Sequence, residues 1–206
     1  MTQPTPDAHP HGILFVLSGP SGVGKDTVLR RALPKLGRIR TSISVTTRAP
    51  RPREAFGVDY FFVTRDEFLA MQAKGDLLEH ALVHDNFYGT PRGWLLEQLQ
   101  QGIDVVLAID VQGALQVRRL YPEAVLIFLA PPSWDELTRR LRGRATEDEA
   151  TMQRRLENAR QELSRVDEYN YLIVNDNLHE ATERLRAIVL AERSRPCRQE
   201  HRLQGT

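Results

Sequence analysis

The chain has 206 residues, 41% of them hydrophobic, and its 28 basic and 27 acidic side chains give a formal net charge of +1. This length predicts one domain with a substantial core and insertions. The balanced charge argues against a role on nucleic acid or on a membrane surface that depends on bulk charge. The sequence has no apolar run of membrane-spanning length. The single cysteine, Cys197, excludes an intrachain disulfide and indicates a reducing compartment.

The two ends of the chain differ from the rest in composition. Residues 1–11 lack the basic start and apolar segment of a signal peptide, so they predict a disordered leader. Residues 196–206 are polar and predict a frayed tail. We therefore expect a soluble, cytoplasmic protein whose folded domain spans residues 12–195.

A phosphate-binding motif follows the first apolar run, residues 13–17. Residues 19–25 have the spacing Gly-x-x-x-x-Gly-Lys, and a helical pattern begins at Val28. This strand, turn and helix start predict a P-loop, whose backbone N–H groups face phosphate oxygens while Lys25 reaches the outer phosphates. The alternative is a glycine turn that binds no phosphate, but the preceding strand and the following lysine argue against it. The residues expected to contact a nucleoside triphosphate are Gly19, Pro20, Ser21, Gly22, Val23, Gly24, Lys25, Asp26 and Thr27.

One position departs from the P-loop pattern. Asp26 stands where a serine or threonine usually offers its hydroxyl to Mg²⁺. Thr27 follows directly and can supply a hydroxyl, while Asp26 can reach the ion directly or through water. An interpretation of equal weight makes Asp26 an ordinary acidic residue of the first helical turn, favoured by the helix dipole.

Apolar runs alternate with helical patterns along most of the chain, which predicts an α/β fold with a parallel sheet covered by helices. The expected strands are residues 13–17, 104–109, 124–129 and 171–174. The expected helices are residues 28–33, 113–120, 133–142, 147–166 and 179–193.

Residues 44–90 interrupt this alternation and predict an inserted lobe. Residues 46–57 are rich in proline and arginine and predict a loop. Residues 58–63 and 77–83 predict strands on either side of a short helix at 66–74.

Several motifs beyond the P-loop resemble those of the guanylate kinase family, in order and with matching spacing from residue 13 to residue 193. They are residues 44–54 (S-V-T-T-R-A-P-R-P-R-E), Gly57, Tyr60, Glu79, residues 88–90 (Y-G-T), 109–113 (I-D-V-Q-G), 140–144 (R-L-R-G-R) and 174–176 (V-N-D). The resemblance implies a P-loop nucleoside monophosphate kinase fold with a GMP-binding lobe at 44–90 and a lid region at 140–156. It also implies ATP-dependent phosphorylation of GMP to GDP, a reaction of purine nucleotide metabolism and GMP recycling.

The resemblance assigns the GMP phosphate to Arg48 and Arg51, together with the hydroxyls of Tyr60 and Tyr88. Guanidinium groups suit this role because they form paired, charge-assisted hydrogen bonds with phosphate. The alternative is a solvated basic loop. The two prolines stiffen the loop, which favours a preset grip on phosphate, but loops rich in proline and arginine are common.

Glu79 lies in a mostly apolar predicted strand, where an unpaired carboxylate would be costly. The resemblance implies that it accepts hydrogen bonds from N1–H and the 2-amino group of guanine, with Ser44 and Thr90 near O6. Adenine lacks that 2-amino donor and would leave the carboxylate unsatisfied. The alternative is that Glu79 points to solvent from the exposed face of its strand.

Asp110 ends the predicted strand 104–109, where a P-loop fold places its nucleotide. A carboxylate there can hold Mg²⁺ through water, so Asp110 and Thr27 are the expected metal-binding residues. The resemblance also places Asp110 beside GMP. Ala108 departs from the family pattern, which commonly has an acidic residue there that helps to bind the guanine nucleotide.

The family resemblance assigns Arg140, Arg144 and Arg155 to a mobile lid that closes over the transferring phosphate, and places Asn175 near adenine. For each arginine the alternative is a surface salt bridge. The substrates implied are ATP and GMP, with Mg²⁺ as cofactor and no nucleic-acid or membrane partner. GMP's phosphate has a second pKa of about 6, so no general base is required.

Two rival functions are compatible with parts of the sequence. Asp26 after Lys25 is also a feature of a related kinase that phosphorylates a ribose bisphosphate. A guanylate-kinase-like scaffold that grips phosphopeptides is the second rival, but such modules usually have a degraded P-loop. Oligomeric state is not fixed by the sequence.

Overall fold

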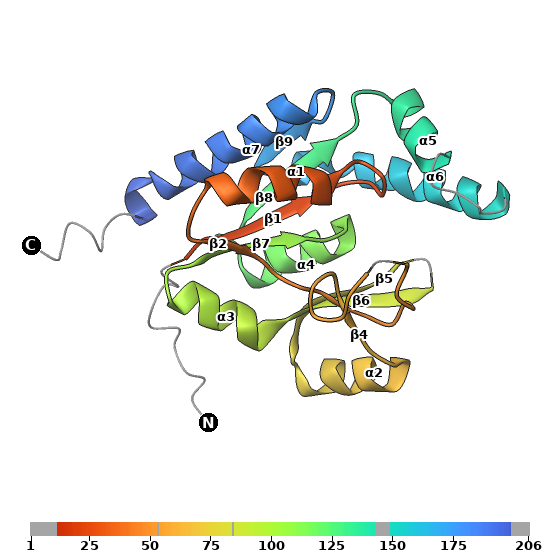
Figure 1. The fold of residues 1–206 in the computed structure, drawn as a ribbon, viewed down its shortest axis with the longest axis horizontal. Helices are drawn as coiled ribbons and strands as arrows, with labels where there is room; N and C mark the ends of the chain where they lie inside the picture. Colours follow the sequence, from red (N-terminus) through yellow and green to blue (C-terminus); the bar gives the residue numbers. More distant parts are fainter. Residues whose placement is uncertain (1–11, 53, 84, 143–148, 199–206) are drawn as a thin grey trace, which may run out of the picture.

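The computed structural model describes residues 12–52, 54–83, 85–142 and 149–198. These residues form a larger α/β part and a smaller lobe (Figure 1). The larger part contains a sheet of five strands in the order β2-β7-β1-β8-β9, and every neighbouring pair is parallel. Its strands are β1 (Leu14–Ser18), β2 (Ile39–Thr41), β7 (Asp104–Ala108), β8 (Val125–Ala130) and β9 (Tyr171–Val174).

Helices cover both faces of this sheet, which is why its central strands are apolar throughout. Along β1 alternate side chains enter different cores: Phe15 and Leu17 pack with α1 (Lys25–Ala32) and α7 (Leu178–Arg193). Leu14 and Val16 pack with the opposite layer, and all five residues of β1 are buried. The helices of that opposite layer are α3 (Arg92–Gln100) and α4 (Val111–Leu120).

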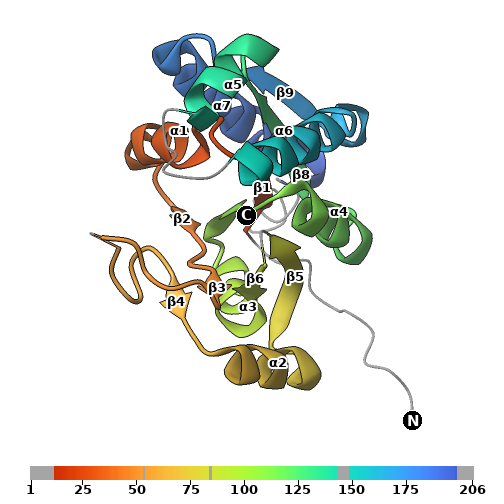
Figure 2. The ribbon, with the colours of Figure 1, turned by 90° about the vertical axis from the view of Figure 1, so that its right-hand side faces the viewer.

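The smaller lobe is a four-stranded sheet in the order β4-β3-β6-β5 with one helix, set below the larger sheet in Figure 2. Its elements are β3 (Val45–Thr46), β4 (Phe61–Phe62), α2 (Arg65–Lys74), β5 (Leu77–Val83) and β6 (Asn86–Pro91). Phe68 of α2 is fully buried against Val45 and Leu77. A capping box between Thr64 and Glu67 fixes the start of α2.

Two further helices, α5 (Trp134–Arg142) and α6 (Glu149–Leu163), pack together through Leu137, Leu141, Met152 and Ala159. The short 3₁₀ helices are η1 (Leu33–Lys35), η2 (Val166–Glu168) and η3 (Pro196–Arg198). In the described part of the chain, no helix has the length and apolar character needed to cross a membrane.

The structure confirms the predicted fold class and the main strands and helices, with boundaries shifted by a few residues. The smaller lobe was predicted less well. Only Phe61–Phe62 of the predicted strand 58–63 is a strand, and Thr46, expected in a loop, belongs to β3. Strand β6 and helix α3 were not predicted, nor was the short edge strand β2.

Candidate functional site

The P-loop lies at the carboxyl end of β1, directly before α1. Gly19 has φ of 143° and Gly24, the N-cap of α1, has φ of 100°, backbone angles that L side chains rarely adopt. A Cβ at Gly19 would lie 2.2 Å from the carbonyl oxygen of Leu129, so β8 leaves room only for glycine. The turn is thus bent so that the helix N-terminus opens toward the cavity beside it.

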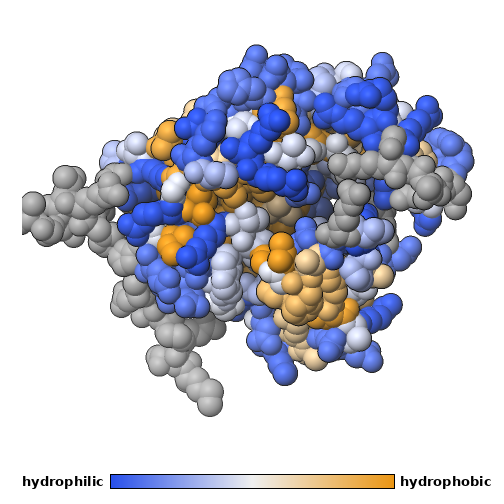
Figure 3. Space-filling model, viewed as in Figure 1, coloured by the Kyte–Doolittle hydropathy of each residue, from blue (hydrophilic) through white to orange (hydrophobic). Residues whose placement is uncertain are grey.

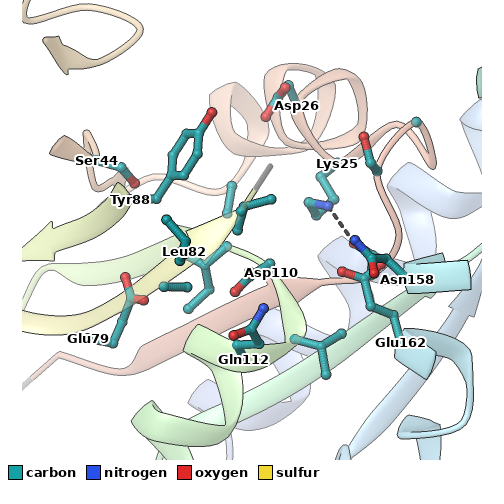
Figure 4. A pocket seen from close by; sticks show the side chains of 18 of the residues that line it. Lys25, Asp26, Ser44, Glu79, Leu82, Tyr88, Asp110, Gln112, Asn158 and Glu162 are labelled. Atoms are coloured by element: carbon teal, nitrogen blue, oxygen red, sulfur yellow. Dashed lines mark hydrogen bonds between the residues drawn. The ribbon is translucent and has the colours of Figure 1, made fainter. Parts of the chain in front are cut away.

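Lys25 lies in this turn and its ammonium donates to the carbonyl oxygen of Gly19 at 2.6 Å and to that of Pro20 at 3.4 Å. The next two residues, Asp26 and Thr27, are exposed and line the same cavity. Figure 4 shows Lys25 directed across the cavity toward Glu162 and Asn158. The ammonium of Lys25 therefore lies where the phosphates of a nucleotide bound to the turn would contact it.

The cavity has a volume of about 600 Å³ and extends from the P-loop to the smaller lobe. The space-filling view shows mostly hydrophilic side chains on the face seen in Figure 3, with a hydrophobic area over the smaller lobe. The predicted site residues that line this cavity are Gly19, Ser21, Gly22, Gly24, Lys25, Asp26, Thr27, Ser44, Arg51, Tyr60, Glu79, Tyr88, Asp110 and Arg155. The same cavity is thus lined by residues expected to bind the triphosphate and by most of those expected to bind GMP.

Glu79, on β5, is only 3% exposed although its carboxylate lines the cavity. Thr90, on the neighbouring strand β6, lies behind it and donates its hydroxyl to Oε1 at 2.7 Å. Burial raises the pKa of Glu79 to about 7, and the nearby Asp110 carboxylate acts in the same direction. The carboxylate is therefore a buried acceptor whose hydrogen-bond donors, the hydroxyl and the backbone N–H of Thr90, are both neutral. The alternative in which it points to solvent is wrong.

Arg48 does not line the cavity but lies immediately behind it. Its Nε donates to the hydroxyl of Tyr88 at 3.2 Å, and its Nη2 donates to both carboxylate oxygens of Glu54 at 2.9 Å. The guanidinium also lies 5.5 Å from the ring centroid of Tyr60. Glu54 accepts from the backbone N–H of Arg51 as well, at 2.7 Å, so this carboxylate ties both arginines of the loop together.

Two aromatic hydroxyls complete this side of the cavity. The rings of Tyr60 and Tyr88 meet edge to face with centroids 6.0 Å apart. Burial raises the pKa of Tyr60 to about 12, and the carboxylate of Asp26 adds to this effect, so its hydroxyl stays protonated as a donor. Asp26 thus faces the smaller lobe across the cavity from Tyr60.

Asp110 is the N-cap of α4, and its Oδ1 accepts from the backbone N–H of Gly113 at 2.8 Å. Burial raises the pKa of Asp110, while the positive charge of Lys25 opposes the rise. One carboxylate oxygen is thus fixed by the helix, and the side chain faces the cavity between Glu79 and Lys25 (Figure 4). Ala108, the residue that departs from the family pattern, lines the cavity two residues earlier.

A second cavity, of about 450 Å³, lies on the other side of the P-loop. Arg140 and Asn175 line it together with Gly22, Gly24 and Thr27. Asn175 is buried and donates its amide to the carbonyl oxygen of Val23 at 2.8 Å, which fixes it to the phosphate-binding turn.

The predicted lid arginines differ in their surroundings. Arg140 pairs with Glu136 at 2.7 Å and also approaches the carbonyl oxygens of Val23 and Asn175, both at 3.4 Å. Arg155 lies on α6 and lines the first cavity. Arg144 lies outside the described residues.

The sequence predictions missed the polar face of α6. Asn158, Gln161, Glu162 and Arg165 line the first cavity beside Arg155. Burial raises the pKa of Glu162 to about 7, opposed by the charge of Lys25. The spacing of Arg155, Asn158 and Glu162 is helical, and a polar stripe beside the apolar residues of α6 could have identified this face.

The fold and this site define a P-loop nucleotide-binding protein of the α/β class. The family model described as guanylate kinase matches residues 12–192. A guanylate kinase of Desulfitobacterium hafniense is 46% identical over 195 residues, which are 95% of this chain and 98% of that protein. One of Bacillus subtilis is 51% identical over 182 residues, covering 88% of this chain and 89% of its own.

A solved structure gives the same result. The crystal structure of guanylate kinase from Anaplasma phagocytophilum superimposes with a TM-score of 0.78 at 39% identity, covering 91% of this chain and 89% of that one. The chain belongs to the guanylate kinase family.

Proposed function

We propose that this protein transfers the γ-phosphoryl group of ATP to GMP, giving ADP and GDP. The observation that carries this proposal is the buried carboxylate of Glu79, which faces the same cavity as the P-loop lysine. Guanine presents two adjacent donors, N1–H and the 2-amino group, that suit such an acceptor. A buried acceptor left without donors is costly, so the site favours guanine over adenine.

ATP binds, in this proposal, with its phosphates on residues 19–27 and its adenine in the second cavity. The bent backbone of the turn and the N-terminus of α1 favour anionic oxygens. Asn175 and Arg140 line the second cavity, which opens directly from Gly22 and Gly24. This arrangement directs the terminal phosphate from the P-loop toward the first cavity.

GMP occupies the smaller-lobe end of the first cavity. Glu79 receives the base, with Thr90 behind its carboxylate and Ser44 at the O6 side of guanine, while Arg51, Tyr60 and Tyr88 receive the phosphate. Arg48 joins them by releasing part of its contact with Glu54, since all three of its guanidinium nitrogens have protein partners in the described structure. These residues form the GMP-binding lobe, residues 44–90.

The residues near Lys25 fit Mg²⁺, which prefers few protein oxygens and keeps waters and phosphate oxygens as its other ligands. No group of three or more carboxylate, histidine or cysteine side chains in the described residues could hold a metal ion, so a dedicated protein cage is not the arrangement here. Thr27 and Asp110 would hold the ion. When bound, it would neutralise charge on the phosphates.

Catalysis in this proposal is electrostatic and positional. The phosphate of GMP is largely dianionic near neutral pH, because its second pKa is about 6, and it attacks without a general base. Lys25 and the arginines Arg140, Arg144 and Arg155 stabilise the charge of the transferring group. Residues 140–156 act as the lid region, whose closure excludes water from ATP.

The test is a coupled ADP-release assay with GMP, AMP and a ribose bisphosphate as acceptors, run with Mg²⁺ and with the ion chelated. GMP should be the preferred acceptor and chelation should abolish turnover. Preference for the ribose bisphosphate would instead favour the related kinase that shares Asp26 after Lys25. ATP-independent binding of phosphopeptides without turnover would favour a scaffold. The single cysteine and the substrates lead us to propose the cytoplasm as its compartment.

We expect the KM for GMP to rise as the pH falls from 8 to 6. Burial raises the pKa of Glu79 to about 7, so its carboxyl gains a proton across this range and loses acceptor capacity for guanine. The rise should approach roughly tenfold per pH unit below that pKa. Initial rates at saturating ATP measure it.

The control for this prediction is the Glu79→Gln variant, which should keep only the dependence that belongs to the GMP phosphate, with its pKa of about 6. A parent KM for GMP that is unchanged between pH 6 and 8 would contradict the assignment of Glu79.

A further inference from the structure

Gly113 is the third residue of α4, a buried position inside a helix where glycine is normally unfavourable. Its φ is helical, so the backbone does not require glycine here. The reason lies on the neighbouring strand β5. Figure 4 shows Glu79 of that strand lying opposite the start of α4, where Asp110 and Gln112 are labelled.

A side chain at position 113 would collide with the carboxylate of Glu79. A Cβ built on Gly113 would lie 2.4 Å from Oε2 of Glu79 and 3.1 Å from its Cδ. The carboxylate cannot turn away freely, because Oε1 accepts from the hydroxyl of Thr90 at 2.7 Å and the side chain is 3% exposed. Thr90 therefore binds one oxygen of the carboxylate, and the missing side chain of Gly113 leaves the space that the other oxygen occupies.

The helix itself is fixed against the strand. The side-chain amide of Gln116, one turn further along α4, donates to the carbonyl oxygen of His80 at 2.6 Å. The backbone N–H of His80 donates in return to Oε1 of Gln116 at 3.2 Å. Because this pair joins α4 to the residue after Glu79, the helix cannot shift to make room for a larger residue at 113.

We propose that Gly113 is a positioning residue for base recognition: the absence of a side chain there lets the carboxylate of Glu79 lie at the depth and angle that guanine requires. The inference rests on the proposed function and adds a residue that acts through Glu79. The atoms nearest to a methyl group at 113 belong to side chains, the carboxylate of Glu79 and Cδ1 of Ile109, and not to the backbone. Recognition of the base should therefore suffer more than the fold.

The test is the Gly113→Ala variant of the full chain. We expect its KM for GMP to rise roughly 10- to 100-fold, the loss that follows when hydrogen bonds to a charged group are misaligned. Its kcat at saturating GMP should change much less, and its affinity for ATP, measured by calorimetry without GMP, should not change. The matched control is Gly93→Ala in α3, where an added Cβ meets nothing within 4 Å. That variant should keep the parent values.

A second comparison separates the contact from general damage. In a Glu79→Ala background the obstructing carboxylate is gone, so Gly113→Ala should raise Tm, since alanine favours helix more than glycine. In the parent background the same change should raise Tm less or lower it. If Gly113→Ala alone fails to fold, the double variant should fold.

The possible results separate the proposed function of the protein from the role of Gly113. A parent protein without GMP turnover would overturn the proposed function. An active parent whose Gly113→Ala variant has the same KM for GMP would overturn the role of Gly113 alone. An equal change in Tm in both backgrounds, or a double variant that fails to fold, would also overturn it.

Discussion

Replacing Lys25 by methionine should lower kcat for GMP phosphorylation by roughly 10²- to 10³-fold or more, the cost of removing one preorganised donor at a charged transition state. The ammonium of Lys25 lies against the carbonyl oxygen of Gly19 at 2.6 Å, at the edge of the cavity that both substrates would share. Methionine keeps much of the length and apolar volume of the side chain, so the turn should retain its shape. Steady-state kinetics with saturating ATP and GMP measure the loss.

The matched control is Lys35→Met. Lys35 is exposed in η1 and makes a surface ion pair with Glu183 at 3.7 Å, a contact of small energetic value. Its removal should leave kcat within about twofold of the parent, as expected for an exposed pair. A Lys25→Met enzyme with similarly unchanged kcat would show that this lysine does not meet the transferring phosphate.

An element of the fold could be predicted from the sequence when the residues that identify it lie within one short segment. The P-loop could be predicted because its spacing, the strand before it and the helix after it lie in one short segment. Strands β5, β7, β8 and β9 were also predictable, because each lies in a mostly apolar run. The family resemblance then supplied the guanine-binding assignment of Glu79, and the structure adds that this carboxylate is buried.

The smaller lobe was harder because its strands depend on their partners. Strand β3 has two residues and pairs with β4 on one side and β6 on the other, so no period in its own sequence identifies it. Strand β6 contains Gly89 and ends at Pro91, residues that usually mark turns. Pairing with β5 overrides that local preference.

Some contacts in the site could not be predicted either, because they depend on how distant segments pack or on the conformation of a loop. The contact of Arg48 with Glu54 lies within one loop, but the loop conformation that produces it has no periodic signal. Gly113 in the sequence is only a glycine near a helix start. Its fit against Glu79 depends on the docking of α4 on β5, 34 positions away in the chain.

Replacing Glu79 by glutamine should raise the KM for GMP by roughly 10- to 100-fold, because the amide presents a donor to guanine N–H groups and removes a charged acceptor. ATP binding, measured without GMP, should not change, since Glu79 lies at the smaller-lobe end of the cavity. The control is Glu123→Gln, an exposed site outside both cavities. It should match the parent in both measurements.

The Glu79→Gln variant should also be more stable than the parent at pH 8. Burial raises the pKa of Glu79 in the folded protein to about 7, above its usual value of 4.5, so the folded state binds this proton more tightly than the unfolded state does. The group therefore favours folding most below pH 4.5, and that contribution is lost as the pH rises toward 7. Glutamine has no such dependence.

Between pH 5 and pH 8 the parent should consequently lose roughly 1 to 3 kcal/mol of unfolding free energy relative to Glu79→Gln. Urea denaturation of both nucleotide-free proteins at the two pH values measures this difference. A difference that is the same at both pH values would mean that the carboxylate is not held in the buried state described here. If it does change with pH, the charge that selects guanine also destabilises the empty site, and bound GMP recovers that free energy by supplying donors to the carboxylate.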